Sequence, residues 1–284
     1  MILVFGQSGQ VATEIARQAG NTVTCIGRDV ADLSDPDDCA AVIVARKPTA
    51  VINAAAWTAV DNAEDHEAEA AVINGDAPGA MARACADLGI PFVHISTDYV
   101  FEGTGTDAWS PTDPVSPQNA YGRTKLKGEE SVRAAGGIHA ILRTSWVVSA
   151  HGGNFVKTML RLGAERPRLT IVADQIGGPT PAADIAATCL TIAEQLQAAP
   201  DKSGTYHLSG DPDVSWADFA REIFAQAGLS PEVVDIPTAD FPTPATRPLN
   251  SRLDNSTLTD TFSMARPDWR EGLRNILADL DAVK

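Results

Sequence analysis

The sequence contains few cysteines and histidines, and neither kind is grouped. The four cysteines, Cys25, Cys39, Cys85 and Cys189, are far apart and form no C-x-x-C motif, so no disulfide framework is predicted. The five histidines are equally scattered, and none lies at metal-ligand spacing from another. We therefore expect buried free thiols in a reducing cytoplasm and no metal site.

Basic residues and long apolar runs are also scarce. The chain has 22 basic and 37 acidic side chains, a net charge of −15, whereas a protein that neutralises nucleic-acid phosphates is usually basic. No apolar run approaches the roughly 20 residues that a membrane-spanning helix needs, and residues 1–6 lack the basic region of a signal peptide. The composition thus predicts a cytoplasmic protein that binds neither nucleic acid nor a membrane.

Short apolar runs alternate with longer helical patterns in the first half of the 284-residue chain. The predicted strands are Ile2–Phe5, Val23–Gly27, Ala50–Asn53, Pro91–Ser96 and Ile138–Arg143. The predicted helices are a stretch ending at Ala19, Asp37–Arg46, Glu64–Leu88 with a break near Gly75–Gly79, and Tyr121–Ala135. Because parallel strands need crossover connections, this order predicts an α/β fold with a doubly wound parallel sheet.

The pattern becomes less regular after Trp146. Further predicted elements are the helices Phe155–Leu162, Ala182–Leu196, Ser215–Ala227 and Trp269–Leu280 and the strand Gly204–Ser209, whereas the proline-rich stretch Pro231–Pro248 is expected to form loops. We predict a dinucleotide-binding domain of residues 1–147, completed by parts of 170–210. Residues 148–169 and 210–284 are expected to form a smaller C-terminal substrate-binding lobe over the carboxyl edge of the sheet, where ligands bind in such folds.

The first turn carries small residues at positions 6, 9 and 12, directly after a strand and at the start of a helix. Gly6 permits the sharp turn, Gly9 lets a pyrophosphate approach the backbone, and Ala12 lets the helix pack closely on the sheet. The free N–H groups around Gln10 and Val11 then face the anion. This pattern predicts a dinucleotide site; the alternative is a purely structural strand–helix turn.

The second predicted strand ends at Gly27 and Arg28 rather than at an acidic residue. An acidic residue there would bind the ribose hydroxyls of NAD, whereas an arginine suits the 2′-phosphate of NADPH. NADPH is therefore favoured, with NADH as a second acceptable cofactor. Alternatively, Arg28 stacks on the adenine or faces water. Asp32 and Leu33 are expected near the adenine edge.

Tyr121 and Lys125 are four residues apart and share one helix face. A nearby ammonium favours the phenolate, so we expect the pKa of Tyr121 to be lowered toward the working range of an acid or base. Such a pair can move a proton at a carbonyl or hydroxyl while a nicotinamide exchanges a hydride. Thr97, at the carboxyl end of a predicted strand, is placed to orient the reacting oxygen. The alternative is an ordinary surface pair.

With these motifs together, the chain resembles the extended short-chain dehydrogenases/reductases, which have the Rossmann fold, and more closely the dTDP-4-dehydrorhamnose reductase family. The resemblance runs along nearly the whole chain. The stretches that carry it are Gly6–Val11, Val51–Ala56, Thr58–Asp61, Ser96–Phe101, Tyr121–Lys125, Arg143–Val147, Asn154–Leu162, Asp174–Thr180 and Arg247–Leu253.

The resemblance implies that the chain reduces the 4-keto group of dTDP-4-dehydro-6-deoxy-L-mannose to dTDP-L-rhamnose, with Tyr121 as proton donor, Lys125 as its tuner and a ribose contact, and Thr97 as the orienting group. The implied cofactor contacts are Gly9, Gln10, Val11, Ala56, Trp57, Thr58 and Ile95. The implied substrate contacts are Thr97, Asp98, Trp146, Asn154 and Arg247. Two alternatives stay open, because Trp146 also suits a core aromatic and Asn154 a helix cap.

Other readings of the sequence differ in activity and assembly. The same fold serves other sugar-nucleotide reductases and epimerases, and a non-catalytic regulatory subunit would keep the nucleotide site alone.

The family is associated with Mg²⁺ held by glutamates between subunits, and Glu14 matches one such position. Ala183 lies where a second carboxylate would be expected, and one carboxylate supplies few of the oxygens that Mg²⁺ needs. We expect no metal, and either a monomer or a homodimer.

Overall fold

The central sheet of the computed structural model, which describes residues 1–282, consists of six parallel strands in the order β10-β5-β4-β3-β1-β2. The strands are β1 (Ile2–Phe5), β2 (Val23–Ile26), β3 (Ala50–Asn53), β4 (Phe92–Thr97), β5 (His139–Thr144) and β10 (Gly204–Leu208). The predicted α/β doubly wound fold is confirmed, and the predicted strands agree with these bounds to within one residue at either end.

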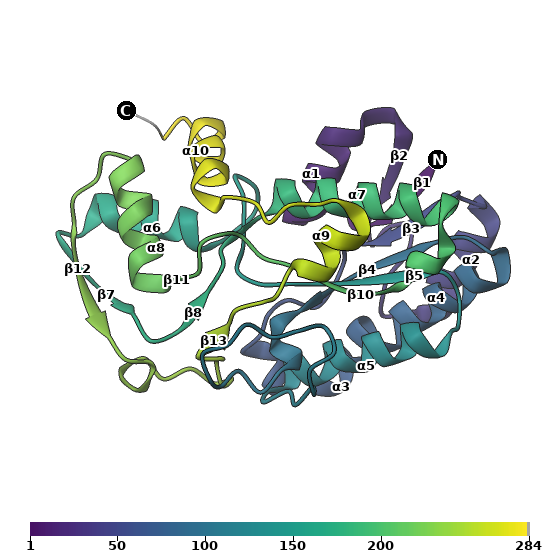
Figure 1. The fold of residues 1–284 in the computed structure, drawn as a ribbon, viewed down its shortest axis with the longest axis horizontal. Coiled ribbons are helices and arrows are strands. Elements are labelled where there is room, and N and C mark those ends of the chain that lie inside the picture. Colours follow the sequence, from purple (N-terminus) through teal and green to yellow (C-terminus); the bar gives the residue numbers. More distant parts are fainter. Residues whose placement is uncertain (283–284) are drawn as a thin grey trace.

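Helices cover both faces of this sheet (Figure 1). They are α1 (Gln10–Ala19), α2 (Pro36–Arg46), α3 (Glu67–Ala71), α4 (Ala77–Leu88), α5 (Ala120–Ala134) and α7 (Ala182–Ala198). The alternation of side chains along β1 explains the two layers. Val4 packs with Ile15 of α1 and Ile185 of α7 on one face, whereas Leu3 packs with Met81 of α4 on the other.

A separate lobe lies beside the sheet, in the left half of Figure 1. It is built from α6 (Phe155–Glu165), α8 (Trp216–Gln226), α10 (Trp269–Asp279) and the parallel pair β7 (Arg168–Val172) and β12 (Glu232–Ile236). Phe219 and Trp269 lie at the centre of its core. The remaining elements are β6 (Val147–Val148), β8 (Ile176–Gly177), β9 (Thr180–Pro181), β11 (Val214–Ser215), β13 (Asn250–Ser251) and α9 (Ser256–Phe262).

Two local predictions were wrong. Pro231–Pro248 was expected to form loops, but β12 lies within it, because the run Glu232–Ile236 contains no proline and the flanking prolines do not interrupt its hydrogen bonds with β7. The break expected near Gly75–Gly79 is a π-helical turn, Val72–Asp76, that joins α3 to α4. Pro78 lies in the first turn of α4, directly after this π-helical turn.

None of the helices within residues 1–282 combines the length and the apolar character that crossing a membrane requires.

Candidate active site

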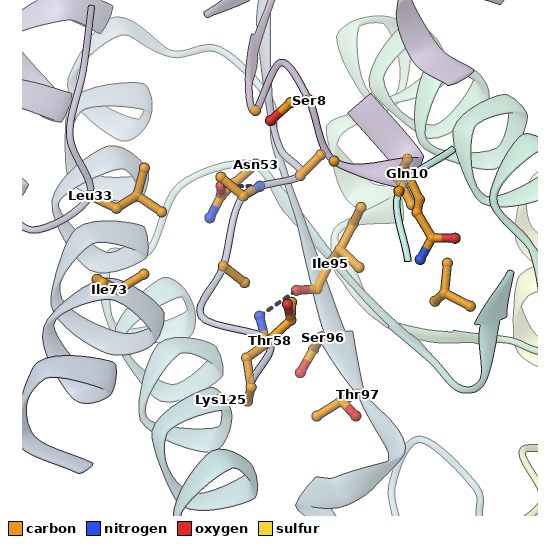
Figure 2. Close-up of a pocket in the computed structure, with 18 of the residues that line it drawn as sticks. Ser8, Gln10, Leu33, Asn53, Thr58, Ile73, Ile95, Ser96, Thr97 and Lys125 are labelled. Atoms are coloured by element: carbon orange, nitrogen blue, oxygen red, sulfur yellow. Dashed lines mark hydrogen bonds between the residues drawn. The ribbon is translucent and has the colours of Figure 1, made fainter. Parts of the chain in front are cut away.

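A cavity of 810 Å³ lies at the carboxyl ends of β1, β3 and β4 and collects most of the predicted site residues. Figure 2 shows this cavity with side chains from loops, from β4 and from α5 around it. The predicted residues in its lining are Gly6, Gly9, Gln10, Val11, Arg28, Asp32, Leu33, Ala56, Thr58, Ile95, Thr97, Asp98, Tyr121, Lys125 and Trp146. Sequence reasoning missed further lining residues, which include Ser8, Asn53, Ile73, Ser96, Gly152 and Gly153.

The glycine-rich turn after β1 has the geometry of an anion cradle. Gly6 has a φ of +117°, and a Cβ at this position would lie 3.2 Å from the Cβ of Ala12 and 3.3 Å from the carbonyl oxygen of Ala54. Only glycine fits there. Gly9 is the N-cap of α1, and within residues 1–282 no side chain caps this helix start. Its first N–H groups are therefore available to a phosphate.

The side chain of Gln10 holds a segment of the C-terminal half against this turn. Gln10 Oε1 accepts hydrogen bonds from Ser149 Oγ at 2.8 Å and from Asn154 Nδ2 at 2.9 Å. Asn154 Oδ1 in turn accepts from the backbone N–H of Lys157 at the start of α6. Asn154 is thus the cap of α6, the alternative that the sequence had left open beside a substrate contact, and it is not among the described residues that line the two cavities.

Trp57, a predicted cofactor contact, is held by hydrogen bonds of its indole and of its backbone. Its indole Nε1 donates to the carbonyl oxygen of Ala59, and its ring lies 6.0 Å from that of His66. Asn74 binds the backbone of Trp57 on both sides, accepting from its N–H at 2.8 Å and donating to its carbonyl at 3.1 Å. The indole therefore lies outside the part of the lining formed by residues 1–282, whereas its neighbour Thr58 faces the cavity.

Thr97, Tyr121 and Lys125 come together from β4 and α5. Asn119 caps α5 by accepting from the N–H of Gly122, and a Cβ at Gly122 would lie 2.3 Å from the carbonyl oxygen of Tyr99. The glycine therefore lets the first turn of α5 approach the segment that follows β4. Lys125 Nζ donates to the carbonyl oxygen of Ile95 at 2.7 Å, as Figure 2 shows.

Burial governs the acid–base properties of these groups. It raises the pKa of Tyr121 to about 12, against a hydrogen bond with Thr97 that favours the phenolate. It lowers the pKa of Lys125 to about 8, although the nearby charge of Glu129 acts in the opposite direction. The predicted lowering of the Tyr121 pKa is therefore wrong, because burial disfavours the phenolate more than the hydrogen bond with Thr97 favours it. Tyr121 is a neutral phenol at neutral pH, and this form can donate a proton.

A buried ion pair between α5 and β5 also binds the carboxyl end of β4. Arg143 of β5 donates to Glu129 of α5 through Nε at 2.8 Å and through Nη2 at 2.7 Å. Ser96 Oγ donates to the same carboxylate at 2.7 Å. The side chains of Glu129 and Arg143 are 0% and 3% exposed. This network fixes α5 to the strand that carries Thr97, and nothing in the spacing of the sequence had indicated it.

A second cavity, of 740 Å³, adjoins the first, and Tyr99 and Trp146 line both. Trp146 has a φ of +49°, which is rare for a bulky residue, and its ring stacks on Trp216 with centroids 3.6 Å apart. Arg247 lines the second cavity, and its Nη2 donates to Asp61 Oδ2 at 2.7 Å. Of the predicted substrate residues, Thr97 and Asp98 line the first cavity, Arg247 lines the second and Trp146 lines both, whereas Asn154 lines neither.

The carboxylate of Glu14, the residue that matches a metal-site position of the family, already has hydrogen-bond partners within the chain. Its Oε2 accepts from Arg17 Nε at 2.8 Å, and its Oε1 lies 3.0 Å from His151 Nε2. Burial, together with the charges of Glu271 and Glu14, raises the pKa of Asp184, the neighbour of Ala183, to about 6. Within residues 1–282, no three His, Cys, Asp or Glu side chains are arranged to hold a metal ion. These donors do not fit Mg²⁺, which requires several free oxygens.

We accordingly expect chelation to leave the protein unchanged. Added EDTA should alter neither its rate of NADPH oxidation nor its mass in light scattering, because Arg17 and His151 already occupy the Glu14 carboxylate. A mass that halves with EDTA, or activity that returns only with Mg²⁺, would contradict this prediction.

The glycine-rich turn after β1 and the Tyr121–Lys125 pair at the carboxyl edge of a parallel sheet define the class. They place the chain among the extended short-chain dehydrogenases/reductases, which are nucleotide-binding oxidoreductases. The chain belongs to the family described as the RmlD substrate binding domain, whose model matches residues 1–282. The family predicted from the sequence is confirmed.

Similar proteins match along almost the whole chain. A dTDP-4-dehydrorhamnose reductase from Burkholderia thailandensis is 45% identical, and the match covers 98% of each chain. The crystal structure of a dTDP-4-dehydrorhamnose reductase from Clostridium acetobutylicum has a TM-score of 0.92 at 37% identity, covering 99% of each chain. That of the Bacillus anthracis enzyme, in complex with NADP, has a TM-score of 0.90 at 32% identity and covers 98% of each chain.

Proposed function

We propose that this protein reduces the 4-keto group of dTDP-4-dehydro-6-deoxy-L-mannose to dTDP-L-rhamnose with NADPH. One observation carries the proposal: Thr97, Tyr121 and Lys125 line the same cavity as the glycine-rich turn after β1. A proton donor and a dinucleotide cradle in one cavity are what carbonyl reduction by a nicotinamide requires. The names of the relatives from Burkholderia thailandensis and Clostridium acetobutylicum support the choice of substrate.

The chain's own residues fit NADPH. The turn from Gly6 to Val11 would hold the pyrophosphate, and Lys125 would contact the nicotinamide ribose. Arg28 and Leu33 line the same cavity, near the end of β2, where the adenosine half would lie. When bound, the reduced nicotinamide supplies a hydride. The NADP in the Bacillus anthracis relative supports this assignment.

Arg28 gives this cofactor assignment a direct test. Its side chain is 80% exposed and its ion pair with Asp32 is long, with 3.7 Å between Nε and Oδ2, so the guanidinium can turn its other N–H groups to a 2′-phosphate. Replacing it, as in Arg28→Ala, should weaken NADPH binding by about 1–3 kcal/mol and leave NADH binding nearly unchanged. Titration of both cofactors checks this. Equal weakening of the two would mean that Arg28 packs on the adenine instead.

Tyr121 would deliver the proton. As hydride reaches C4, charge develops on the former carbonyl oxygen, and the phenol of Tyr121 donates its proton to that oxygen. Thr97 Oγ1, which donates to Asp98 Oδ1 at 3.0 Å, would help to orient the sugar. Lys125, with a pKa lowered to about 8, would return a proton to Tyr121 after each turnover.

The second cavity suits the nucleotide part of the substrate. Trp146 separates it from the reacting groups, while Phe155 and Trp216 give it aromatic walls and Arg168 and Arg247 give it cationic ones. Aromatic faces suit a pyrimidine base and guanidinium groups suit a diphosphate. We propose that the deoxysugar lies between Tyr121 and Trp146 and that the dTDP extends toward Arg247.

This division matches two proposed units. Residues 1–147 with parts of 170–210 would bind the dinucleotide, and residues 148–169 with 210–284 would bind the sugar nucleotide. The cytoplasm is the proposed location, since the four cysteines are free thiols.

The assay for the activity is loss of the nicotinamide absorbance when purified protein, NADPH and the 4-keto sugar nucleotide are mixed. Turnover supports the reductase, whereas cofactor binding without turnover supports a regulatory subunit.

A further inference from the structure

His94 is a buried histidine beside the proposed catalytic lysine that the mechanism above does not use. It lies on β4, two residues before Ser96, and is 1% exposed. Its Nε2 lies 3.5 Å from Lys125 Nζ, and its Nδ1 lies 3.2 Å from Asn53 Nδ2. Burial and the charge of Lys125 hold the pKa of His94 well below its usual range, so the ring is neutral and carries one proton.

The hydrogen bonds of Asn53 determine which ring nitrogen carries that proton. The backbone N–H of Ala55 can only donate, and it lies 3.2 Å from Asn53 Oδ1. The amide therefore turns its NH₂ group toward His94 Nδ1, which must accept. The proton of the neutral ring is then on Nε2, and this N–H faces Lys125.

An Nε2–H group in this position favours one protonation state of Lys125. A neutral amine has a lone pair that can accept from the imidazole N–H, whereas an ammonium has only donors. The carbonyl oxygen of Ile95 accepts from Lys125 Nζ in either state. The contact with His94 thus stabilises the neutral amine relative to the ammonium.

We propose that His94, oriented by Asn53, is a positioning residue that sets how readily Lys125 gives up its proton to Tyr121. The activity part of this inference rests on the proposed reductase function. The other titratable groups that face Lys125 are Glu129, whose charge favours the ammonium and is paired with Arg143, and Tyr121 and Asp98, which line the same cavity. His94 and Asn53 differ from these groups because they form a chain of directed hydrogen bonds that ends at the lysine amine.

The first test determines directly which ring nitrogen of His94 carries the proton. In ¹⁵N spectra of labelled wild-type protein, the His94 signals, identified by their loss in His94→Gln, should show a protonated Nε2 and a bare Nδ1 from pH 6 to pH 9. A ring protonated on Nδ1, or on both nitrogens, would overturn the proposal. This measurement needs no turnover, so it stands even if the reductase assay fails.

The second test follows the pKa of Lys125 through the pH profile of kcat. Activity should fall as the pH rises through the Lys125 pKa, because the ammonium is the proton source. In His94→Gln, the amide oxygen can accept from the ammonium, so this alkaline limb should move upward by about one pH unit. Asn53→Asp should act in the same direction, because its carboxylate would take the ring proton to Nδ1 and leave the Nε2 lone pair facing Lys125.

His207→Gln provides the matched control. His207 is also a buried neutral histidine on the sheet, but it contacts Arg143 and the carbonyl oxygen of Trp109. Its variant should keep the alkaline limb of the wild type. An unchanged limb in both His94→Gln and Asn53→Asp, or an equal movement in His207→Gln, would overturn the proposal. If His94→Gln does not fold, Asn53→Asp and the wild-type spectrum still decide it.

Discussion

Tyr121→Phe should abolish reduction while leaving cofactor binding nearly intact. The phenylalanine ring fills the same buried space against Tyr99, whose ring meets that of Tyr121 edge-on at 5.5 Å, and the transferable proton alone is lost. General acid catalysis by a positioned group contributes roughly 10²–10⁴-fold, so kcat should fall by about that factor. NADPH oxidation and NADPH titration, measured on the same preparation, check the two parts.

The matched variant for this experiment is Tyr99→Phe. Burial raises the pKa of Tyr99 above its ordinary value, and its phenol has no role in the proposed proton transfer. It should reduce the sugar nucleotide far faster than Tyr121→Phe does. Near-normal turnover in Tyr121→Phe would remove this tyrosine from the mechanism.

Glu129→Gln should destabilise the protein by about 3–5 kcal/mol. The substitution keeps the shape of the side chain but leaves the guanidinium of Arg143 buried without its counter-charge, and such a loss typically costs that much. Urea unfolding followed by circular dichroism gives the difference. Glu165→Gln is the control, because its pair with Arg161 is more than half exposed on both sides and should contribute less than about 0.5 kcal/mol.

The pH dependence of this effect has a definite sign. Arg143 and Ser96 hold the pKa of Glu129 below its usual range despite burial. A carboxyl group with a lowered pKa in the folded state contributes stability above its unfolded pKa and loses it as the pH falls through the folded one. The difference between wild type and Glu129→Gln should therefore be largest at neutral pH and shrink in acid. A difference that grows in acid would contradict the assignment of the pair.

The local parts of the fold were predictable from the sequence because their signals are local. The turn at Gly6 and Gly9 and the spacing of Tyr121 and Lys125 each lie within a few residues, and the structure brings all four into one cavity. By contrast, β12 pairs with β7 although the two segments are about 60 residues apart. Nothing in either segment indicates which other segment it pairs with.

The electrostatics of the site were less predictable. The spacing of Tyr121 and Lys125 says that they share a helix face, but it does not say that both are buried, and burial decides the direction of each pKa shift. The partners of Glu129 and His94 likewise come from other elements, such as Arg143 of β5 for Glu129 and Asn53 of β3 for His94, so their contacts appear only once the sheet and its helices have packed together. Asn154 shows the same limit: its sequence context fits a cap or a contact, and only the packing of Gln10 distinguishes them.

The most direct test of the central claim follows the hydride itself. NADPH carrying deuterium at the transferable position of the nicotinamide is incubated with the protein and dTDP-4-dehydro-6-deoxy-L-mannose, and the product is examined by NMR and mass spectrometry. We expect dTDP-L-rhamnose with one deuterium at C4, formed by wild type and not by Tyr121→Phe. Unlabelled product, deuterium at another carbon, or an epimerised sugar with no oxidation of NADPH would contradict the proposed function.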